Sequence, residues 1–138
     1  MLNIQLEEKE VTRADIRAYY ESGVKSEKDL RVGVEYERLP IFDVTGANVD
    51  YYHEFGICNL LRRFAKEDNW DYITDDFNII GLKKGHQTIT LEPGCQFEYS
   101  LTPKTKISEI KSDIENLDGA LKKCLDDFGI TLLNYGVS

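Results

Sequence analysis

The sequence has 138 residues, which is enough for one domain with a sizeable core, and we expect a single domain over residues 1–138. Its apolar content of 41% is ordinary for a globular protein, and its net charge of −8 argues against nucleic acid and anionic membranes as partners. No run of ~18 apolar residues occurs, and residues 1–10 lack the apolar stretch of a signal peptide, so we expect neither a membrane span nor secretion.

The cysteine content indicates the redox compartment. The chain has three cysteines, an odd number, and they lack the spacing of a metal site. Reduced thiols and a cytoplasmic location are the natural expectation. These cysteines are Cys58, Cys95 and Cys124.

The first predicted element is a helix over residues 13–22. Thr12 and Asp15 form a capping-box pattern at its start, and Gly23 is suited to end it. We expect its inner side to carry Ile16, Tyr19 and Tyr20.

A strand over residues 30–39 follows, and Pro40 is expected to end it. Alternation places Glu35 and Glu37 on one face of this strand. The other face is apolar and consists of Val32, Val34 and Tyr36.

Residues 52–68 predict an amphipathic helix. Its apolar stripe consists of Phe55, Cys58, Leu61, Phe64 and Ala65. Trp70 is expected to pack against the helix end or the sheet. We interpret His53, near the start, as a solvated or capping residue rather than a metal ligand.

Residues 78–103 predict three consecutive strands. Residues 78–83 form the first, residues 84–86 a hairpin turn and residues 87–91 the second. A turn at Pro93-Gly94 leads to the third. The last two strands have an apolar face (Ile89, Leu91, Phe97, Tyr99, Leu101) and a polar face (Thr88, Thr90, Glu92, Gln96, Glu98, Ser100).

If these strands share one sheet, four glutamates gather on its polar face: Glu35, Glu37, Glu92 and Glu98. Glutamate is a poor strand former, and neighbouring carboxylates repel one another, so a hard divalent cation is the hypothesis that explains the pattern best. A solvated sheet face that carries four acids is the alternative. Lys83 and Lys84 either approach a phosphate or carboxylate of a substrate, or form a solvated hairpin tip.

The longest predicted helix covers residues 108–128 and ends at Gly129. Its apolar stripe (Ile107, Ile110, Ile114, Leu117, Leu121, Leu125, Phe128) is expected to cover the apolar side of the sheet. A last strand, residues 130–136, carries no charge or proline to protect an open edge, which predicts a homodimer formed through that edge. The alternative is a monomer whose last strand is shielded inside the sheet.

The order of elements predicts an α+β fold. We expect an antiparallel sheet with helices on one face and the glutamates on the other.

Two motifs carry a family resemblance. GVEYE at residues 33–37 and IIGLKKGHQTITLEPGCQFEYSLTP at residues 79–103 resemble the glutamate–cysteine ligase family of plants and many bacteria. The chain resembles only the N-terminal portion of that family's longer members. Two positions depart from the family pattern: Cys95 stands where glycine is usual, and Tyr99 where leucine is usual.

The resemblance implies part of a glutamine-synthetase-like fold with an acidic concave face. Glu35, Glu37, Glu92 and Glu98 would then bind the Mg²⁺ (or Mn²⁺) ions that hold ATP, with Gln96 and Ser100 supporting them or contacting substrate. The implied reaction joins the γ-carboxyl of L-glutamate to L-cysteine with ATP, the first step of glutathione biosynthesis.

Two alternatives stay open. The chain is a stand-alone, non-catalytic binding domain, or it belongs to a related carboxylate–amine ligase with another amine acceptor. We expect this chain alone to be inactive, because the resemblance assigns the substrate-holding arginines to a later part of the family.

Overall fold

The computed structural model describes residues 10–135. Contacts divide the chain into two compact units, Met1–Leu30 and Arg31–Ser138, which are considered separately below. The single domain expected over residues 1–138 stays a prediction.

In the first unit, helix α1 spans Arg13–Ser22 and a 3-10 turn spans Glu27–Asp29. The predicted capping box is confirmed: the Asp15 N–H donates to Thr12 Oγ1 at 3.2 Å, and the Thr12 N–H donates to Asp15 Oδ2 at 2.9 Å. These bonds satisfy backbone donors that a helix start leaves open. Gly23 is the C-cap, as predicted, with right-handed backbone angles.

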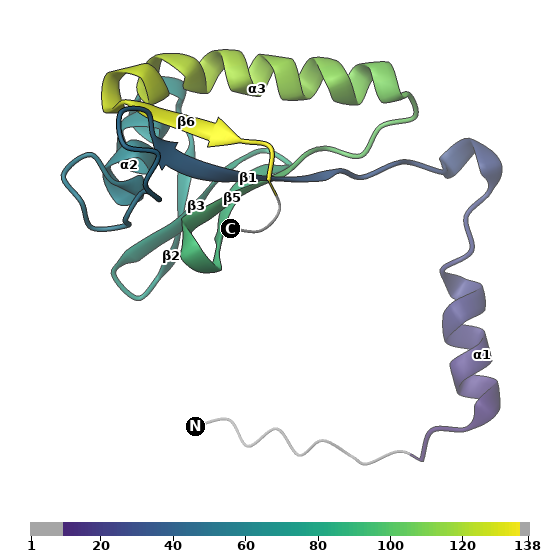
Figure 1. Ribbon diagram of the computed structural model, residues 1–138. Coiled ribbons are helices and arrows are strands. Elements are labelled where there is room, and N and C mark those ends of the chain that lie inside the picture. The colour runs from purple at the N-terminus through teal and green to yellow at the C-terminus, as the bar shows by residue number, and fades with distance from the viewer. Residues whose placement is uncertain (1–9, 136–138) are drawn as a thin grey trace. The chain divides into compact units, whose positions relative to one another are not determined.

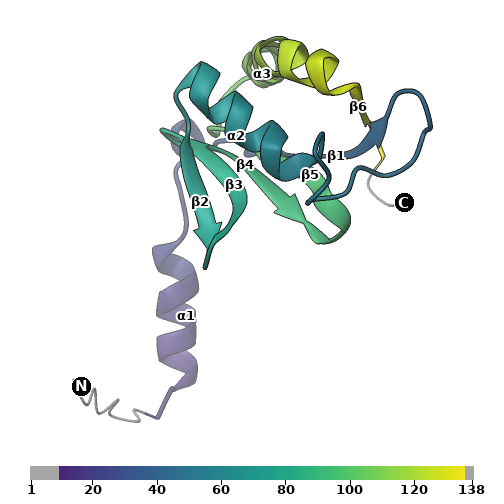
Figure 2. The same ribbon diagram turned by 90° about the vertical axis from the view of Figure 1, so that its left-hand side faces the viewer.

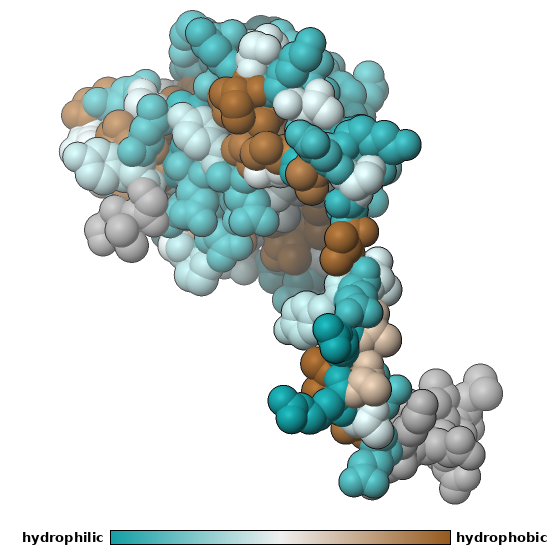
Figure 3. All heavy atoms as spheres, turned by 90° about the vertical axis from the view of Figure 1, so that its right-hand side faces the viewer, coloured by the Kyte–Doolittle hydropathy of each residue, from teal (hydrophilic) through white to brown (hydrophobic). Residues whose placement is uncertain are grey.

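The expected inner side of α1 is wrong. Ile16, Tyr19 and Tyr20 are 49%, 77% and 73% exposed, and no residue of α1 is buried. Brown, apolar atoms are visible on the narrow segment at the lower right of Figure 3. Amphipathic spacing gives a helix an apolar side, but a partner has to cover that side before it becomes an inner one.

The second unit contains a six-stranded antiparallel sheet in the order β2-β3-β4-β5-β1-β6. Together with the helices it confirms the predicted α+β class. The strands are β1 (Glu35–Phe42), β2 (Asp71–Asp75), β3 (Asn78–Lys84), β4 (Gln87–Glu92), β5 (Gln96–Ser100) and β6 (Ile130–Leu133). A 3-10 turn, Pro93–Cys95, joins β4 to β5.

Helices α2 (Ile57–Asp68) and α3 (Ile107–Phe128) lie on one side of this sheet (Figures 1 and 2). The core forms between them and the apolar sides of the strands. Burial of each large side chain contributes about 1.5–3 kcal/mol. Fully buried members include Leu60, Leu61 and Phe64 of α2, Leu121 and Cys124 of α3, and Leu82, Ile89, Phe97 and Tyr99 of the sheet.

The predicted bounds of the first strand are wrong. Residues 30–34 precede β1, and Pro40 lies inside the strand instead of ending it. Residues 35–38 of β1 pair with β5, and residues 39–42 pair with β6. At Pro40 the strand has lost β5 as a partner, and residues 47–49 take that side, with the Val49 N–H donating to the Pro40 carbonyl oxygen at 3.2 Å. A proline lacks an N–H, so it fits where the regular ladder with β5 has ended.

Helix α2 begins five residues later than predicted. The preceding residues form a turn, in which Asp50 Oδ1 accepts from the Tyr52 N–H at 3.0 Å and His53 Nδ1 accepts from the Phe55 N–H at 3.1 Å. Such local bonds compete with helix formation. Gly56 is required at the start of α2, because a Cβ there would lie 2.3 Å from the Asp50 carbonyl oxygen.

Strand β2 was not predicted. It pairs with β3 through a two-residue turn, and Asp76 in that turn has a φ of 50°. Aspartate tolerates this left-handed conformation better than most residues, so Asp75-Asp76 after the strand-forming run Tyr72–Thr74 was the available signal.

The C-terminal elements follow the prediction closely. Gly129 ends α3 with a φ of 63°, and the stripe of α3 contacts the core except for Ile107, which is 70% exposed. Strand β6 is the edge strand that was predicted, but it ends at Leu133, and the predicted end at Gly136 lies outside the described residues. Within residues 10–135 no helix is long and apolar enough to cross a membrane.

Candidate functional site

The side of the sheet that faces away from α2 and α3 carries polar residues in rows across the strands. The registers place Asp71, Lys83, Thr88, Ser100 and Glu35 in one row, from β2 to β1. The next row is Ile73, Gly81, Thr90, Glu98 and Glu37. Because directly paired residues point to the same face, these rows form one surface, called here the polar face.

Glu37 and Glu98 are directly paired across β1 and β5. Gln96 Nε2 donates to Glu37 Oε2 at 2.6 Å. Thr90 Oγ1 and Ser100 Oγ each donate to Glu98 Oε1 at 3.2 Å. Like charges directly opposite one another are unfavourable in a sheet, and these donors offset part of that cost.

The other two predicted glutamates flank this pair. Glu35 lies opposite Ser100, two residues before Glu37, and is exposed. Glu92 ends β4 opposite Gln96 and is also exposed. The polar face thus carries all four predicted glutamates, with Glu37 and Glu98 as its directly paired members.

The two predicted lysines, Lys83 and Lys84, lie on opposite faces of the sheet. Lys83 lies on the polar face, in the row of Thr88 and Ser100. Lys84 points to the opposite face, where its Nζ lies 3.0 Å from Asp68 Oδ2 and donates to the Asp68 carbonyl at 2.7 Å. Burial is the largest single influence on the pKa of Asp68 and raises it, but the hydrogen bonds from Trp70 and Lys84 and the charge of Lys84 together outweigh it and lower the pKa. Lys84 is therefore engaged by α2 and does not join the glutamates.

The donor chemistry of the polar face fits a hard divalent cation. Its candidate ligands are all oxygen atoms, which Mg²⁺ and Mn²⁺ prefer. No group of three or more histidine, cysteine or acidic side chains in the described part of the chain is arranged to hold a metal ion by itself. Magnesium is commonly bound through one or two carboxylates together with substrate phosphates, and the Glu37–Glu98 pair suits that mode.

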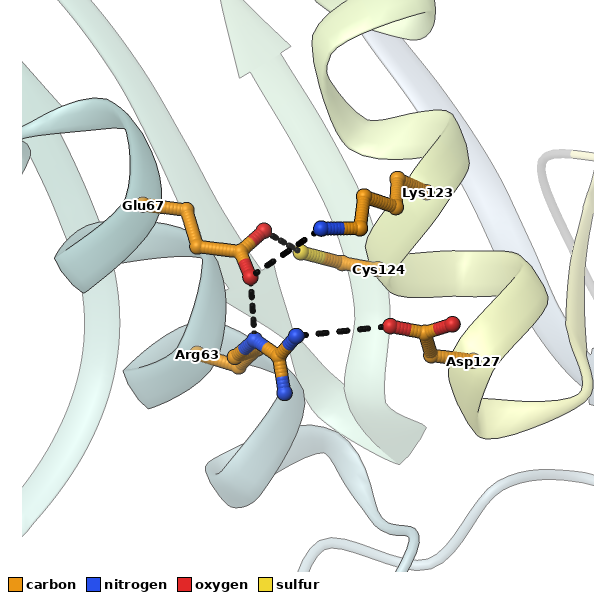
Figure 4. Close-up of polar contacts among 5 residues, drawn as sticks. All are labelled: Arg63, Glu67, Lys123, Cys124 and Asp127. Atoms are coloured by element: carbon orange, nitrogen blue, oxygen red, sulfur yellow. Dashed lines mark hydrogen bonds and ion pairs between the residues drawn. The ribbon is translucent and has the colours of Figure 1, made fainter.

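A second polar cluster joins α2 to α3 on the outer side of the helices (Figure 4). Arg63 pairs with Glu67 and with Asp127, and the Cys124 thiol donates to Glu67 Oε2 at 3.2 Å. Burial first, and then the bond to Glu67, raises the pKa of Cys124 to about 11, so its sulfur stays a protonated donor at neutral pH. We assign this cluster to helix packing.

The site residue that sequence reasoning missed is Thr90. It stood in the predicted polar set, but only the β4–β5 register shows that it reaches Glu98. Threonine is so common in strands that its type gives no functional signal.

The fold and the polar face define an α+β protein in which α2 and α3 cover one face of the sheet and the other face carries paired carboxylates. The family model described as Glutamate-cysteine ligase family 2 (GCS2) matches residues 31–138, and the chain belongs to this family. The predicted resemblance is confirmed by this match.

Named plant enzymes are similar to this chain over most of its length. Glutamate–cysteine ligase B of Oryza sativa subsp. japonica is 33% identical over 126 residues, 91% of this chain and 25% of the relative. The glutamate–cysteine ligases of Brassica juncea and Arabidopsis thaliana are 34% and 33% identical, each with 24% of its length covered. The chain thus spans about a quarter of the length of these relatives.

The comparison corrects one prediction. The cytoplasmic location expected from the cysteines is wrong, because each of these three relatives is named as chloroplastic. Reduced thiols are compatible with more than one compartment, so cysteine content alone could not distinguish between them.

Proposed function

We propose that this chain is the metal- and nucleotide-holding N-terminal part of an ATP-dependent glutamate–cysteine ligase. The observation that carries the proposal is the direct pairing of Glu37 with Glu98 on the polar face of a chain that belongs to this family. A stand-alone binding domain has no need of two facing carboxylates, which repel one another unless a cation lies between them. The names of the relatives support a plastid location for such an enzyme.

The residues of the polar face have separate tasks. Glu37 and Glu98 would hold Mg²⁺ or Mn²⁺, with Glu35 and Glu92 beside them, and the ion would neutralise charge on the phosphates of ATP. Gln96 and Ser100 orient the carboxylates through their hydrogen bonds. Lys83 adds a positive charge on the same face, suited to an anionic substrate.

The proposed reaction has two steps. The γ-carboxylate of glutamate attacks the γ-phosphorus of ATP, and ADP leaves with the electron pair of the broken P–O bond. The amine of cysteine then attacks the acyl carbon, inorganic phosphate leaves, and the amine loses a proton to give the amide. Both steps depend on electrostatic positioning of phosphate and carboxylate groups.

Three arginines near this sheet bond to groups away from the polar face. Arg38 lies on the helix-covered face and is paired with Asp118, while Arg62 and Arg63 lie on α2 and bond to Asn59 and Glu67. We therefore expect the purified chain to show no ADP release that depends on both glutamate and cysteine. Turnover above background that Glu37→Gln abolishes would contradict this expectation and indicate a minimal enzyme.

Metal binding tests the proposal directly. Free Mn²⁺ can be counted by its electron paramagnetic resonance signal while the chain is titrated. The wild type should remove Mn²⁺ from solution at millimolar metal, and Glu98→Gln should not. Glu109→Gln, at an exposed position in the first turn of α3, is the control and should bind as the wild type does. Equal, negligible binding by the wild type and Glu98→Gln would reject the cation site and favour a non-catalytic domain.

We also propose that two copies associate through β6. This edge strand pairs with β1 alone within residues 10–135, and its residues are uncharged. Unprotected edges are templates for another strand. Light scattering over a wide concentration range should give a dimer mass that Leu133→Lys lowers to that of the monomer. A monomer mass for the wild type at every concentration would reject the dimer.

A further inference from the structure

Glu98 is held through one of its two oxygens. Thr90 donates to Oε1 from the neighbouring strand, and Ser100 donates to the same atom from two positions further along β5. The other oxygen, Oε2, accepts no hydrogen bond from any residue between 10 and 135. The carboxylate is therefore anchored on one side and open on the other.

Glu37 shows the same arrangement. Gln96 donates to its Oε2 at 2.6 Å, and its Oε1 accepts no hydrogen bond from the described residues. A bond to an ionised group at this distance is strong and directional, so the side-chain amide fixes which oxygen is left open. The two paired glutamates thus each present one open oxygen.

The neighbouring strand limits movement of Thr90. Gly81 is its partner on β3, and a Cβ on Gly81 would lie 3.2 Å from Thr90 Cα and 2.5 Å from the Ile89 carbonyl oxygen. Only glycine fits this close approach of two backbones, so the backbone of Thr90 lies tightly against β3.

We infer that Thr90, Ser100 and Gln96 are positioning residues that make Glu37 and Glu98 bind a cation through one oxygen each. This inference rests on the proposed function. Mg²⁺ and Mn²⁺ favour compact octahedral coordination, whereas Ca²⁺ takes more oxygen ligands and often both oxygens of one carboxylate. Because the hydrogen bonds compete with a cation for one oxygen of each glutamate, the polar face favours Mg²⁺ or Mn²⁺ over Ca²⁺.

The test measures Mn²⁺ affinity and competition by Ca²⁺ on the full chain, with the same resonance signal of free Mn²⁺. Thr90→Val removes one donor but keeps the branched shape that a strand favours. It should weaken Mn²⁺ binding by about tenfold, as is usual when a partner of a ligating group is lost. It should also lower the ratio of Mn²⁺ affinity to Ca²⁺ affinity, because Glu98 can then bind Ca²⁺ through both oxygens.

Two further variants separate positioning from general damage. Thr90→Ser keeps the hydroxyl and should restore the affinity and the preference for Mn²⁺. Thr88→Val changes the same residue type on the same face and strand, at a position that makes no hydrogen bond to either glutamate, and should leave both unchanged. If Thr90→Val fails to fold, Ser100→Ala removes the other donor to Glu98 and takes its place.

The outcomes are distinct. If Glu98→Gln loses Mn²⁺ while Thr90→Val retains the wild-type affinity and preference, the positioning inference is overturned and the proposed function stands. If the wild type binds no Mn²⁺, both are overturned. Weakening by Thr88→Val equal to that by Thr90→Val would also overturn the inference, because the effect would then not depend on the bond to Glu98.

Discussion

Cys95 holds a backbone conformation that suits glycine better. It follows Pro93 and Gly94 in the turn between β4 and β5, and its φ of 64° lies in the left-handed region. A side chain there costs roughly 1–2 kcal/mol, because its Cβ crowds the backbone. This cost explains why glycine suits this position, where the family pattern usually has it.

Two replacements of Cys95 separate backbone strain from packing. Both Cys95→Gly and Cys95→Ala remove the sulfur, which is partly buried against the core, but only glycine relieves the strain. We expect Cys95→Gly to be more stable than Cys95→Ala by about 1 kcal/mol, the reverse of their order at ordinary positions. Urea denaturation measures the difference, and equal stability of the two variants would contradict the prediction.

A partly buried ion pair ties β1 to α3. Arg38 is 14% exposed and bonds to Asp118 and to the Leu132 carbonyl, while the Tyr99 hydroxyl donates to Asp118 at 3.3 Å. Burial, together with the charge of Asp118, raises the pKa of Tyr99 and keeps its hydroxyl protonated. The Tyr99 hydroxyl therefore stays a donor to Asp118 at neutral pH, while the buried Nε of Arg38 has no hydrogen-bond partner among the described residues.

Removal of Asp118 leaves the Arg38 charge without its partner in the core. Asp118→Ala should lower the free energy of unfolding by about 2 kcal/mol, somewhat less than for a fully enclosed pair because Asp118 keeps some exposure. Asp126→Ala breaks an exposed pair with Lys122 on the same helix and should change stability by less than about 0.5 kcal/mol. Similar losses in the two variants, measured by thermal unfolding, would show that burial of the pair is unimportant.

Among the elements, those whose pattern is complete within a short stretch were predictable. Helix α3 and the β3–β4 hairpin need only their own periodicity and turn residues, and both were predicted within one residue at nearly every bound. The bounds of β1 and the start of α2 were missed because they depend on partner strands and on side-chain bonds to the backbone. Strand β2 was missed because it is short and mostly exposed.

The same reasoning applies to the candidate site. Alternation within single strands placed the four glutamates on the polar side of their strands, and the assumption of a shared sheet brought them to one face before any pairing was known. The pairing of Glu37 with Glu98, and the bond from Thr90, required the register between strands. Lys84 was misplaced because two adjacent strand residues point to opposite faces, and its partner Asp68 lies on a helix sixteen positions away.

Replacement by alanine should have opposite effects on stability at two glycines, Gly119 inside α3 and Gly129 at its end. Gly129 has a φ of 63°, so Gly129→Ala should destabilise the fold by about 1 kcal/mol. Gly119 lies in the helix interior with open space where a Cβ would be, so Gly119→Ala should stabilise by roughly 0.5–1 kcal/mol. Melting curves should move in opposite directions, and a shared direction would contradict the assignment of Gly129 as a left-handed cap.

At the scale of the whole molecule, the described core belongs to the second unit. Its buried apolar residues run from Leu39 to Leu132, and none lies in residues 10–30. A chain that begins at Arg31 should therefore fold with a melting temperature within about 2 °C of the full chain, since residues 10–30 contribute no buried apolar side chain.

A deletion at the other end is the contrast. Removal of residues 130–138 takes away Ile130 and Leu132, both buried, and should lower stability by several kcal/mol at about 1.5–3 kcal/mol for each side chain. If the loss of residues 1–30 lowered the stability as much as this deletion, the prediction that the first unit does not contribute to the core would be contradicted.

The rows of the polar face also constrain how this chain can change over evolutionary time. Glu98 lies between Phe97 and Tyr99, which are both fully buried on the opposite face. An insertion or deletion of one codon inside β5 would turn the glutamate toward the helices and an aromatic ring toward solvent. Length variation in this lineage should therefore collect in the turns, such as Gly85-His86, while the strands that carry the glutamates keep their length. Selection for a packed core thus keeps the register of the strands that carry the glutamates, even without selection on the site itself.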